Sequence, residues 1–220
     1  MKKYEKIKSP FKRCVNNTSE VDYGNWTTPE IEMLKDISWI ATEKIDGTNC
    51  GIIWNGYEIT YQGRTKKTQF PQHSLEALDK IFKAEGMEEK FEEIFGDKEV
   101  ILFGELYGKK IQKGEIYRDD ISFALFDVYW VELDVYNNIS AVADIASKLG
   151  IDMAPLIFQP TTLKYAMQYV AQEPTSIISL KEQKPVMEGL VLRPLYELRD
   201  KNGERILLKI KVKDFKNYVE

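Results

Sequence analysis

The chain has 220 residues, 43% of them hydrophobic and 30% charged, with a formal net charge of −4. This composition is ordinary for a soluble globular protein, and no stretch approaches the roughly 18 apolar residues of a membrane span. His73 is the only histidine and the two cysteines form no CxxC motif, which argues against a serine–histidine–aspartate triad, a multi-histidine metal site and a disulfide framework.

These exclusions set several expectations. Any metal is expected to be bound by oxygen, which favours Mg²⁺ or Mn²⁺. We expect a monomer in a reducing, cytoplasmic setting (bacterial, phage or other intracellular), with no membrane attachment. The net negative charge does not exclude nucleic acid as a partner, because a local basic stripe is what binds phosphates.

In chain order, the first 25 residues are polar and are predicted to be irregular. A short helix is predicted to follow, with Thr27 and Glu30 at capping-box spacing and its end near Asp36. Asn55-Gly56 is the strongest turn signal in the chain, and it predicts a hairpin of residues 49–54 and 57–62.

The rest of the chain alternates between helical patterns and apolar, β-branched runs. Helices are predicted at residues 74–83, 87–95, 140–149 and 163–171. Strands are predicted at residues 37–41, 100–106, 121–130, 189–194 and 206–212. Hairpins interleaved with helices predict an α+β fold with largely antiparallel sheets flanked by helices, in a single domain of residues 1–220.

The first stretch that carries chemistry is residues 43–49, Glu-Lys-Ile-Asp-Gly-Thr-Asn, between two predicted strands. One interpretation is a charged hairpin turn in which Gly47 takes a positive φ. The other makes Lys44 a nucleophile, since a lysine amine can attack an electrophile once it has lost its proton. The heptapeptide alone does not decide between them.

Polar residues recur in five further stretches, each at the end or centre of a predicted strand. Each has an ordinary structural explanation, such as a solvated lysine on an edge strand or a phenylalanine in the core. Lys209 and Lys211 alternate with apolar residues, so both are predicted to point to one face. The stretches are Gly63-Arg64, Phe103-Gly-Glu105-Leu-Tyr-Gly, Phe123-Ala-Leu-Phe-Asp127, Glu188-Gly-Leu-Val-Leu-Arg193 and Leu207-Leu-Lys209-Ile-Lys211.

Taken in this order, the stretches from Glu43 to Lys211 resemble the five motifs of the covalent nucleotidyltransferase superfamily, which includes ATP-dependent DNA and RNA ligases and mRNA-capping enzymes. The run from Phe103 through Ile111-Gln-Lys-Gly-Glu-Ile-Tyr117 to Asp127 is similar to the RNA ligase 2 family. Asp46 departs from that family, which commonly carries histidine there, and is the choice of DNA ligases and capping enzymes.

The resemblance implies an ATP-grasp-like nucleotidyltransferase domain and a role for each motif residue. Lys44 would carry AMP covalently, with Lys209 and Lys211 contacting the α-phosphate. Glu188 would hold Mg²⁺ or Mn²⁺, with Asp46 as a helper near the metal or the nucleophile. The remaining implied nucleotide contacts are Glu43 with the base, Glu105 with the ribose, Phe123 stacked on adenine, and Arg64 with the ribose or a strand phosphate.

The implied function is an ATP-dependent RNA ligase that joins a 3'-hydroxyl to a 5'-phosphate through lysyl-AMP and adenylylated-strand intermediates, in RNA repair or nick sealing. Its partners would be RNA ends or a nicked duplex. A minimal DNA or polynucleotide ligase is an alternative, and a guanylyltransferase a more distant one. From another class, the chain could be a non-catalytic domain that binds nucleic-acid ends or a nucleotide.

Only residues 214–220 follow the last lysine motif, so neither an OB-fold nor a C-terminal helical domain is expected within this sequence. The sequence is thus either a truncated piece or a naturally minimal ligase. We therefore expect the chain to join pre-adenylated donors better than it seals nicks from ATP, and comparable rates with both would contradict this expectation.

Overall fold

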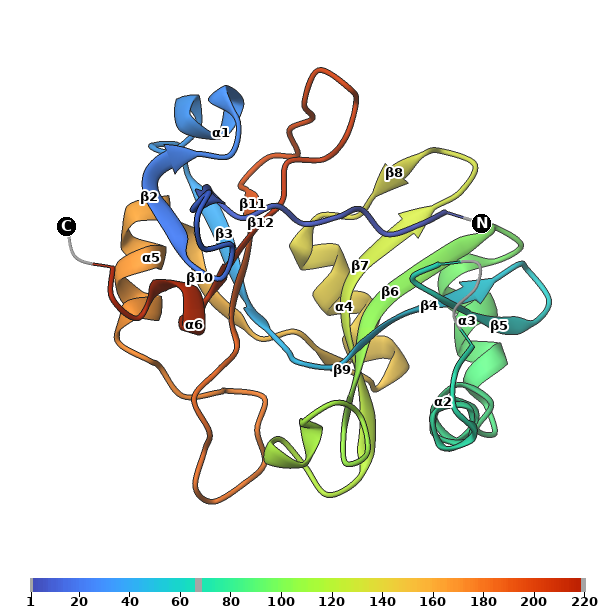
Figure 1. Cartoon of the computed structure of the whole chain (residues 1–220). Coiled ribbons are helices and arrows are strands. Elements are labelled where there is room, and N and C mark those ends of the chain that lie inside the picture. Colours follow the sequence, from blue (N-terminus) through green and yellow to red (C-terminus); the bar gives the residue numbers. More distant parts are fainter. Residues whose placement is uncertain (1, 66–68, 219–220) are drawn as a thin grey trace. The chain divides into compact units, whose positions relative to one another are not determined.

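A computed structural model describes residues 2–65 and 69–218 (Figure 1). Contacts among these residues divide the chain into two compact units. Unit 1 comprises Met1–Tyr4 and Asp46–Ala154, and unit 2 comprises Glu5–Ile45 and Pro155–Glu220. The single domain over residues 1–220 stays a prediction, and each unit is described by itself.

Unit 2 is built on an antiparallel sheet. Within its described residues, four strands lie in the order β10-β3-β11-β12, so β3 and β11 are central. Their bounds are Leu156–Thr161 for β10, Trp39–Lys44 for β3, Gly189–Pro194 for β11 and Leu208–Lys211 for β12. The predicted strand over residues 206–212 is therefore shorter than expected, since α6 (Val212–Phe215) begins directly after Lys211.

Helix α5 (Leu163–Ala171) lies against β11 and β12 (Figure 1). Its buried positions follow the i, i+3, i+4, i+7 spacing of an amphipathic helix. They pack with the side chains that alternate along one face of the sheet, among them Trp39, Leu190 and Ile210. One face of this sheet is thus the core of unit 2, and the intervening residues of each strand point to the other face.

The prediction of an irregular N-terminal region is wrong in part. Phe11–Arg13 (β1) and Val21–Trp26 (β2) form an antiparallel pair. Phe11 is buried, and its ring packs at a tilt against the ring of Trp26. Aromatic packing therefore stabilises two strands that the polar composition of this segment does not predict.

The first helix, α1 (Pro29–Met33), begins one residue later than the predicted capping box. Thr28, not Thr27, is the N-cap, and its hydroxyl accepts a hydrogen bond from the amide of Ile31. The Thr27 hydroxyl instead donates to the backbone carbonyl of Ser9.

Unit 1 is built on a second, mainly antiparallel sheet. Among its described residues the strand order is β5-β4-β6-β7-β8, with β9 added in parallel beside β7. The bounds are Thr48–Trp54 for β4, Ile59–Gly63 for β5, Val100–Gly108 for β6, Ile121–Trp130 for β7, Val135–Tyr136 for β8 and Asp152–Met153 for β9. The predicted hairpin is present, and Gly56 has the positive φ of +94° that its turn requires.

The helices of unit 1 supply the rest of its core. Their bounds are Gln72–Phe82 for α2, Met87–Phe95 for α3 and Ile139–Leu149 for α4, with a short 3-10 helix, η1, at Gly114–Ile116. Phe82 and Phe91 are fully buried and pack edge to face. Three of the four longer predicted helices thus lie here, and the fourth is α5.

The α+β prediction is confirmed, because antiparallel sheets flanked by helices make up both units. No helix in the described part of the chain has the length and apolar character needed to cross a bilayer.

Candidate active site

Lys44, Glu188 and Lys211 form an ion cluster on the face of the unit 2 sheet that α5 does not cover. Lys44 Nζ lies 2.5 Å from Glu188 Oε2, and Lys211 Nζ lies 2.6 Å from Glu188 Oε1. The three side chains are only 17–22% exposed. One carboxylate therefore contacts two ammonium groups and neutralises only one of them, so the cluster carries a net charge of +1.

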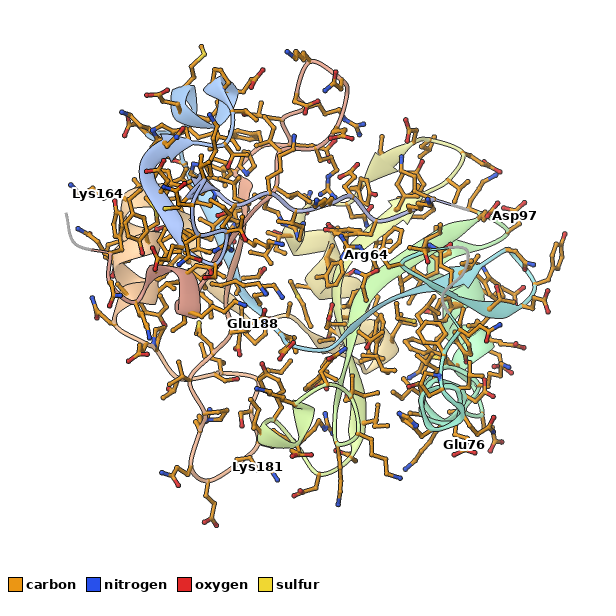
Figure 2. The ribbon with its side chains drawn as sticks, viewed as in Figure 1. Arg64, Glu76, Asp97, Lys164, Lys181 and Glu188 are labelled. Atoms are coloured by element: carbon orange, nitrogen blue, oxygen red, sulfur yellow. The ribbon has the colours of Figure 1, made fainter. Side chains whose placement is uncertain are left out.

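Strand register brings these residues together from distant parts of the sequence. Gly189 on β11 pairs with Lys44 on β3 on one side and with Lys211 on β12 on the other. Residues paired across antiparallel strands point to the same face, so the two lysines flank the start of β11. Glu188, labelled in Figure 2, directly precedes that start. Its carboxylate contacts both lysines.

The backbone directly after Glu188 accepts only glycine, which is the residue found there, Gly189. Its φ of +153° disfavours residues with a side chain, and a Cβ added there would lie 2.0 Å from the carbonyl oxygen of Ile210. The close approach of β12 that puts Lys211 beside Glu188 therefore requires glycine at this position.

Lys209 lies on the same face as Lys211, as the alternating pattern predicts. Leu208 and Ile210 are buried in the unit 2 core, whereas Lys209 and Lys211 are half-buried on the other side. Lys209 pairs with Val191, two residues further along β11 from Gly189.

Glu43 points to the opposite face from Lys44, because consecutive strand residues alternate. It is 2% exposed and lies on the side of α5. Oε1 accepts a hydrogen bond of 2.5 Å from the Ser176 hydroxyl, and Oε2 accepts from the amides of Ile177 and Ile178 at 2.8 and 3.1 Å. The pKa of nearby Tyr169 is raised, first by burial and then by the charge of Glu43.

Glu105 and Phe123 lie on neighbouring strands of unit 1. Glu105 on β6 is half-buried and pairs with Ala124 on β7, and a Cβ on Gly47 would lie 2.9 Å from its Cγ. Burial, and then the charge of Glu105, raises the pKa of the Cys50 thiol. The structure thus places Glu105 beside Gly47, the glycine that follows Lys44 in residues 43–49.

Phe123 on β7 is 1% exposed and packs edge to face on Phe82, with ring centroids 5.1 Å apart. Gly104 makes room for it, since a Cβ there would lie 2.2 Å from the Phe123 ring. In this structure Phe123 is a core residue of unit 1, and its stacking on adenine stays a prediction.

Asp46 and Arg64 also belong to unit 1. The amide of Asp46 donates a hydrogen bond of 3.1 Å to the Tyr117 hydroxyl, which fixes the backbone two residues after Lys44. Arg64 is exposed and directly follows β5 (Figure 2). The neighbouring Lys66 and Lys67 lie outside the described residues.

The carboxylate of the cluster suits a divalent ion that takes few of its ligands from the protein. No group of three or more His, Cys, Asp or Glu side chains that could hold a metal occurs among residues 2–65 and 69–218. Glu188 offers one carboxylate between two cations. That suits Mg²⁺ or Mn²⁺, which often bind through one or two carboxylates together with substrate phosphates and water.

Comparison with protein families decides the classification. The family described as RNA ligase matches residues 37–211, which include Lys44, Glu188 and Lys211. The chain belongs to the RNA ligase family. A comparison with curated proteins gives no match.

Solved structures of a Naegleria gruberi RNA ligase share the fold. A variant with ATP and Mn has a TM-score of 0.61 at 20% identity, over 83% of this chain and 51% of that one. A variant with AMP and Mn has a TM-score of 0.63 at 18% identity, over 93% and 55%, and the ligase with PPi has 0.62 at 20%, over 93% and 55%. The chain spans about half the length of these structures.

Sequence patterns alone missed Ser176, Ile177 and Ile178. Two of their three contacts with Glu43 come from backbone amides, which have no residue-type signature. The available signal was Glu43 itself, because a carboxylate within an otherwise buried strand needs hydrogen-bond donors.

Proposed function

We propose that this chain is the nucleotidyltransferase part of an ATP-dependent RNA ligase that joins a 3'-hydroxyl to a 5'-phosphate. The observation that carries the proposal is the Lys44–Glu188–Lys211 cluster, in which a candidate nucleophile and a second cation share one carboxylate. Membership of the RNA ligase family and the shared fold support it.

In the first step the Lys44 amine would attack the α-phosphorus of ATP. Lys44 first gives one proton to solvent. The Nζ–P bond then forms as the bond from phosphorus to the pyrophosphate oxygen breaks, and Nζ gives a second proton to solvent while pyrophosphate leaves. For this attack Lys44 must exchange its contact with Glu188 for one with the phosphate. Lys211, already on the same face, and Lys209 would neutralise the charge that develops on the phosphoryl oxygens.

Glu188 would be the protein ligand of Mg²⁺ or Mn²⁺, with Asp46 as a candidate second contributor. When bound, that ion would neutralise charge on the phosphates. Glu105 would position the ribose and Arg64 the ribose or a strand phosphate. These assignments follow from the positions of the residues in the motifs.

AMP would then pass from Lys44 to the 5'-phosphate of a strand, which restores the free lysine. The 3'-hydroxyl of the other strand would attack the adenylylated phosphate, form the new phosphodiester and release AMP. We propose RNA ends or a nicked duplex as the substrate, and a monomer in the cytoplasm as the acting form. Asp46, at a position where DNA ligases carry aspartate, keeps DNA strands as the alternative.

The test is incubation of the purified protein with α-labelled ATP and Mg²⁺, beside Lys44→Ala. We expect a labelled protein band on a denaturing gel for the wild type alone, and its chase into a nicked RNA duplex. No label on wild-type protein that is folded and unadenylylated by mass would contradict the proposal. Label that transfers only to DNA nicks would select the DNA alternative, and label from GTP a guanylyltransferase.

A further inference from the structure

A long loop connects α5 to β11, and its last residue is Glu188. Figure 1 shows this loop in orange, extending from the end of α5 away from the four-stranded sheet. Its outer part is exposed, including Leu180, at 72% exposure, and its base is buried at Ser176 and Met187. The base of this loop therefore adjoins Glu188, whose own carbonyl accepts a hydrogen bond of 2.9 Å from the Val212 amide.

Backbone hydrogen bonds join the two sides of the base. The Ser176 amide donates to the Pro185 carbonyl at 2.8 Å, and the Met187 amide donates to the Pro174 carbonyl at 2.9 Å. Thr175 and Val186 form an isolated antiparallel bridge between them. Residues 174–176 are thus hydrogen-bonded to residues 185–187, which directly precede Glu188.

Glu43 holds the first side of that base. Three donors, namely the Ser176 hydroxyl and the amides of Ile177 and Ile178, occupy its two carboxylate oxygens. Charge-assisted hydrogen bonds of this kind are roughly twice as strong as neutral ones. Glu43 itself is fixed within β3, where its amide donates to the Pro155 carbonyl at 2.8 Å.

We propose that Glu43 is a positioning residue, which holds the base of the Ser176–Glu188 loop and so sets the Glu188 carboxylate against Lys44 and Lys211. This inference rests on the proposed function of that cluster. Consecutive residues of β3 then fix the two ends of one loop, Glu43 from one face of the sheet and Lys44 from the other. The assignment differs from base selection, in which the Glu43 carboxylate would contact the nucleotide.

Three variants and a matched control test this inference. Glu43→Ala removes all three contacts, whereas Glu43→Gln keeps two acceptor positions on its oxygen and lets its amide donate to Ser176. Ser176→Ala removes one contact, and Glu182→Gln makes the carboxylate-to-amide change at an exposed position of the same loop. The readouts are amide exchange at Ile177 and Ile178 without nucleotide, and kcat and KM of Lys44 adenylylation with ATP and GTP.

We expect Glu43→Ala to speed amide exchange at Ile177 and Ile178 by about tenfold or more, since each bond to a charged group contributes measurably. Adenylylation kcat should fall by about 100-fold, with KM for ATP and the preference over GTP unchanged. Glu43→Gln should recover most of both losses, and Glu182→Gln should match the wild type.

A folded Glu43→Ala with wild-type exchange and kcat would overturn the inference. So would a raised KM for ATP with lost discrimination against GTP, which is the result expected of base selection. If Glu43→Ala does not fold, Ser176→Ala decides, because unchanged exchange and unchanged kcat there overturn the inference. Failure of the proposed function is separate, since wild-type protein would then form no lysyl-AMP whatever the exchange data show.

Discussion

Two ion clusters, one in each unit, hold charge in different ways. In unit 2, Glu188 serves two lysines, leaving one positive charge in excess. In unit 1, Arg118 binds Asp120 through two nitrogens, at 2.6 and 3.1 Å, and Asp152 through a third at 3.0 Å. Oδ2 of Asp152 also accepts from the hydroxyls of Ser122 and Tyr107, at 2.6 and 2.9 Å.

The two clusters differ in the sign of their net charge, because Arg118 faces two aspartates whereas Glu188 faces two lysines. Every polar group of the Arg118 cluster named here has a protein partner, so it stabilises the ends of β6, β7 and β9 without an added ion. The Lys44 cluster has its excess cation on a half-buried face, where a polyanion would restore balance. The positive sign of that net charge, more than the number of ion pairs, marks the candidate active site.

The largest effect is expected from Gly189→Ala, because the Lys44 cluster depends on the spacing of its strands. The new Cβ meets the Ile210 carbonyl, and the backbone is held at φ +153°. We expect a loss of about 3 kcal/mol or more in the free energy of unfolding. Gly203→Ala is the control in an open turn, with φ +78° and no atom within 4 Å, and should cost about 1 kcal/mol. Equal losses in urea denaturation would contradict this reading of the strand contact.

A second prediction compares loss of one carboxylate charge in each cluster. Glu188→Gln should lower the rate of lysyl-AMP formation by about 100-fold, because the cations and any bound metal lose their shared anion. Asp152→Asn should leave that rate unchanged while lowering the free energy of unfolding by about 1–3 kcal/mol. Single-turnover labelling and urea denaturation measure the two quantities, and a slow but stable Asp152→Asn would remove the distinction between the clusters.

The smallest effect concerns pH and Asp120. The hydrogen bond from Arg118 is the main cause that lowers the pKa of Asp120 below its ordinary value of 3.8. A carboxyl whose pKa is lower in the folded state stabilises the fold above its unfolded-state pKa, and this contribution is lost as the pH falls through the folded value. Because Asp120 is 66% exposed, the contribution is screened and should be below about 0.5 kcal/mol.

The free energy of unfolding should therefore fall slightly more for wild type than for Asp120→Asn when the pH is lowered from 7 to about 3. Urea denaturation at both pH values measures the difference. Identical losses in the two proteins would show that the Arg118–Asp120 contact adds nothing to acid sensitivity.

Much of this arrangement was accessible from sequence because its signals are local. The Asn55-Gly56 turn, the alternation of Lys209 and Lys211 with apolar residues, and the helical spacing of residues 163–171 each follow from short patterns. The resemblance to the ligase motifs, and no local pattern, implied that Lys44 and Glu188 share one site, although 144 residues separate them.

The remaining features depend on tertiary contacts. Phe11 and Trp26 stabilise strands in a polar segment. One of these strands has three residues, which are too few to show a periodic pattern in the sequence. The opposite orientations of Glu43 and Lys44 follow from strand alternation, but the partners of Glu43 are loop amides that only the folded chain brings near. The burial of Phe123 was equally undecided by its sequence, which suits a core residue or a stacking residue.

The division of the chain between Ile45 and Asp46 has a consequence for its architecture. Residues 46–154 leave unit 2 after β3 and return to it at Pro155, whose carbonyl accepts from the Glu43 amide at 2.8 Å. Exit and re-entry are thus neighbours within unit 2. A gap between neighbouring chain ends costs little loop entropy to close, so the strand register that joins Lys44, Glu188 and Lys211 is set within unit 2 alone.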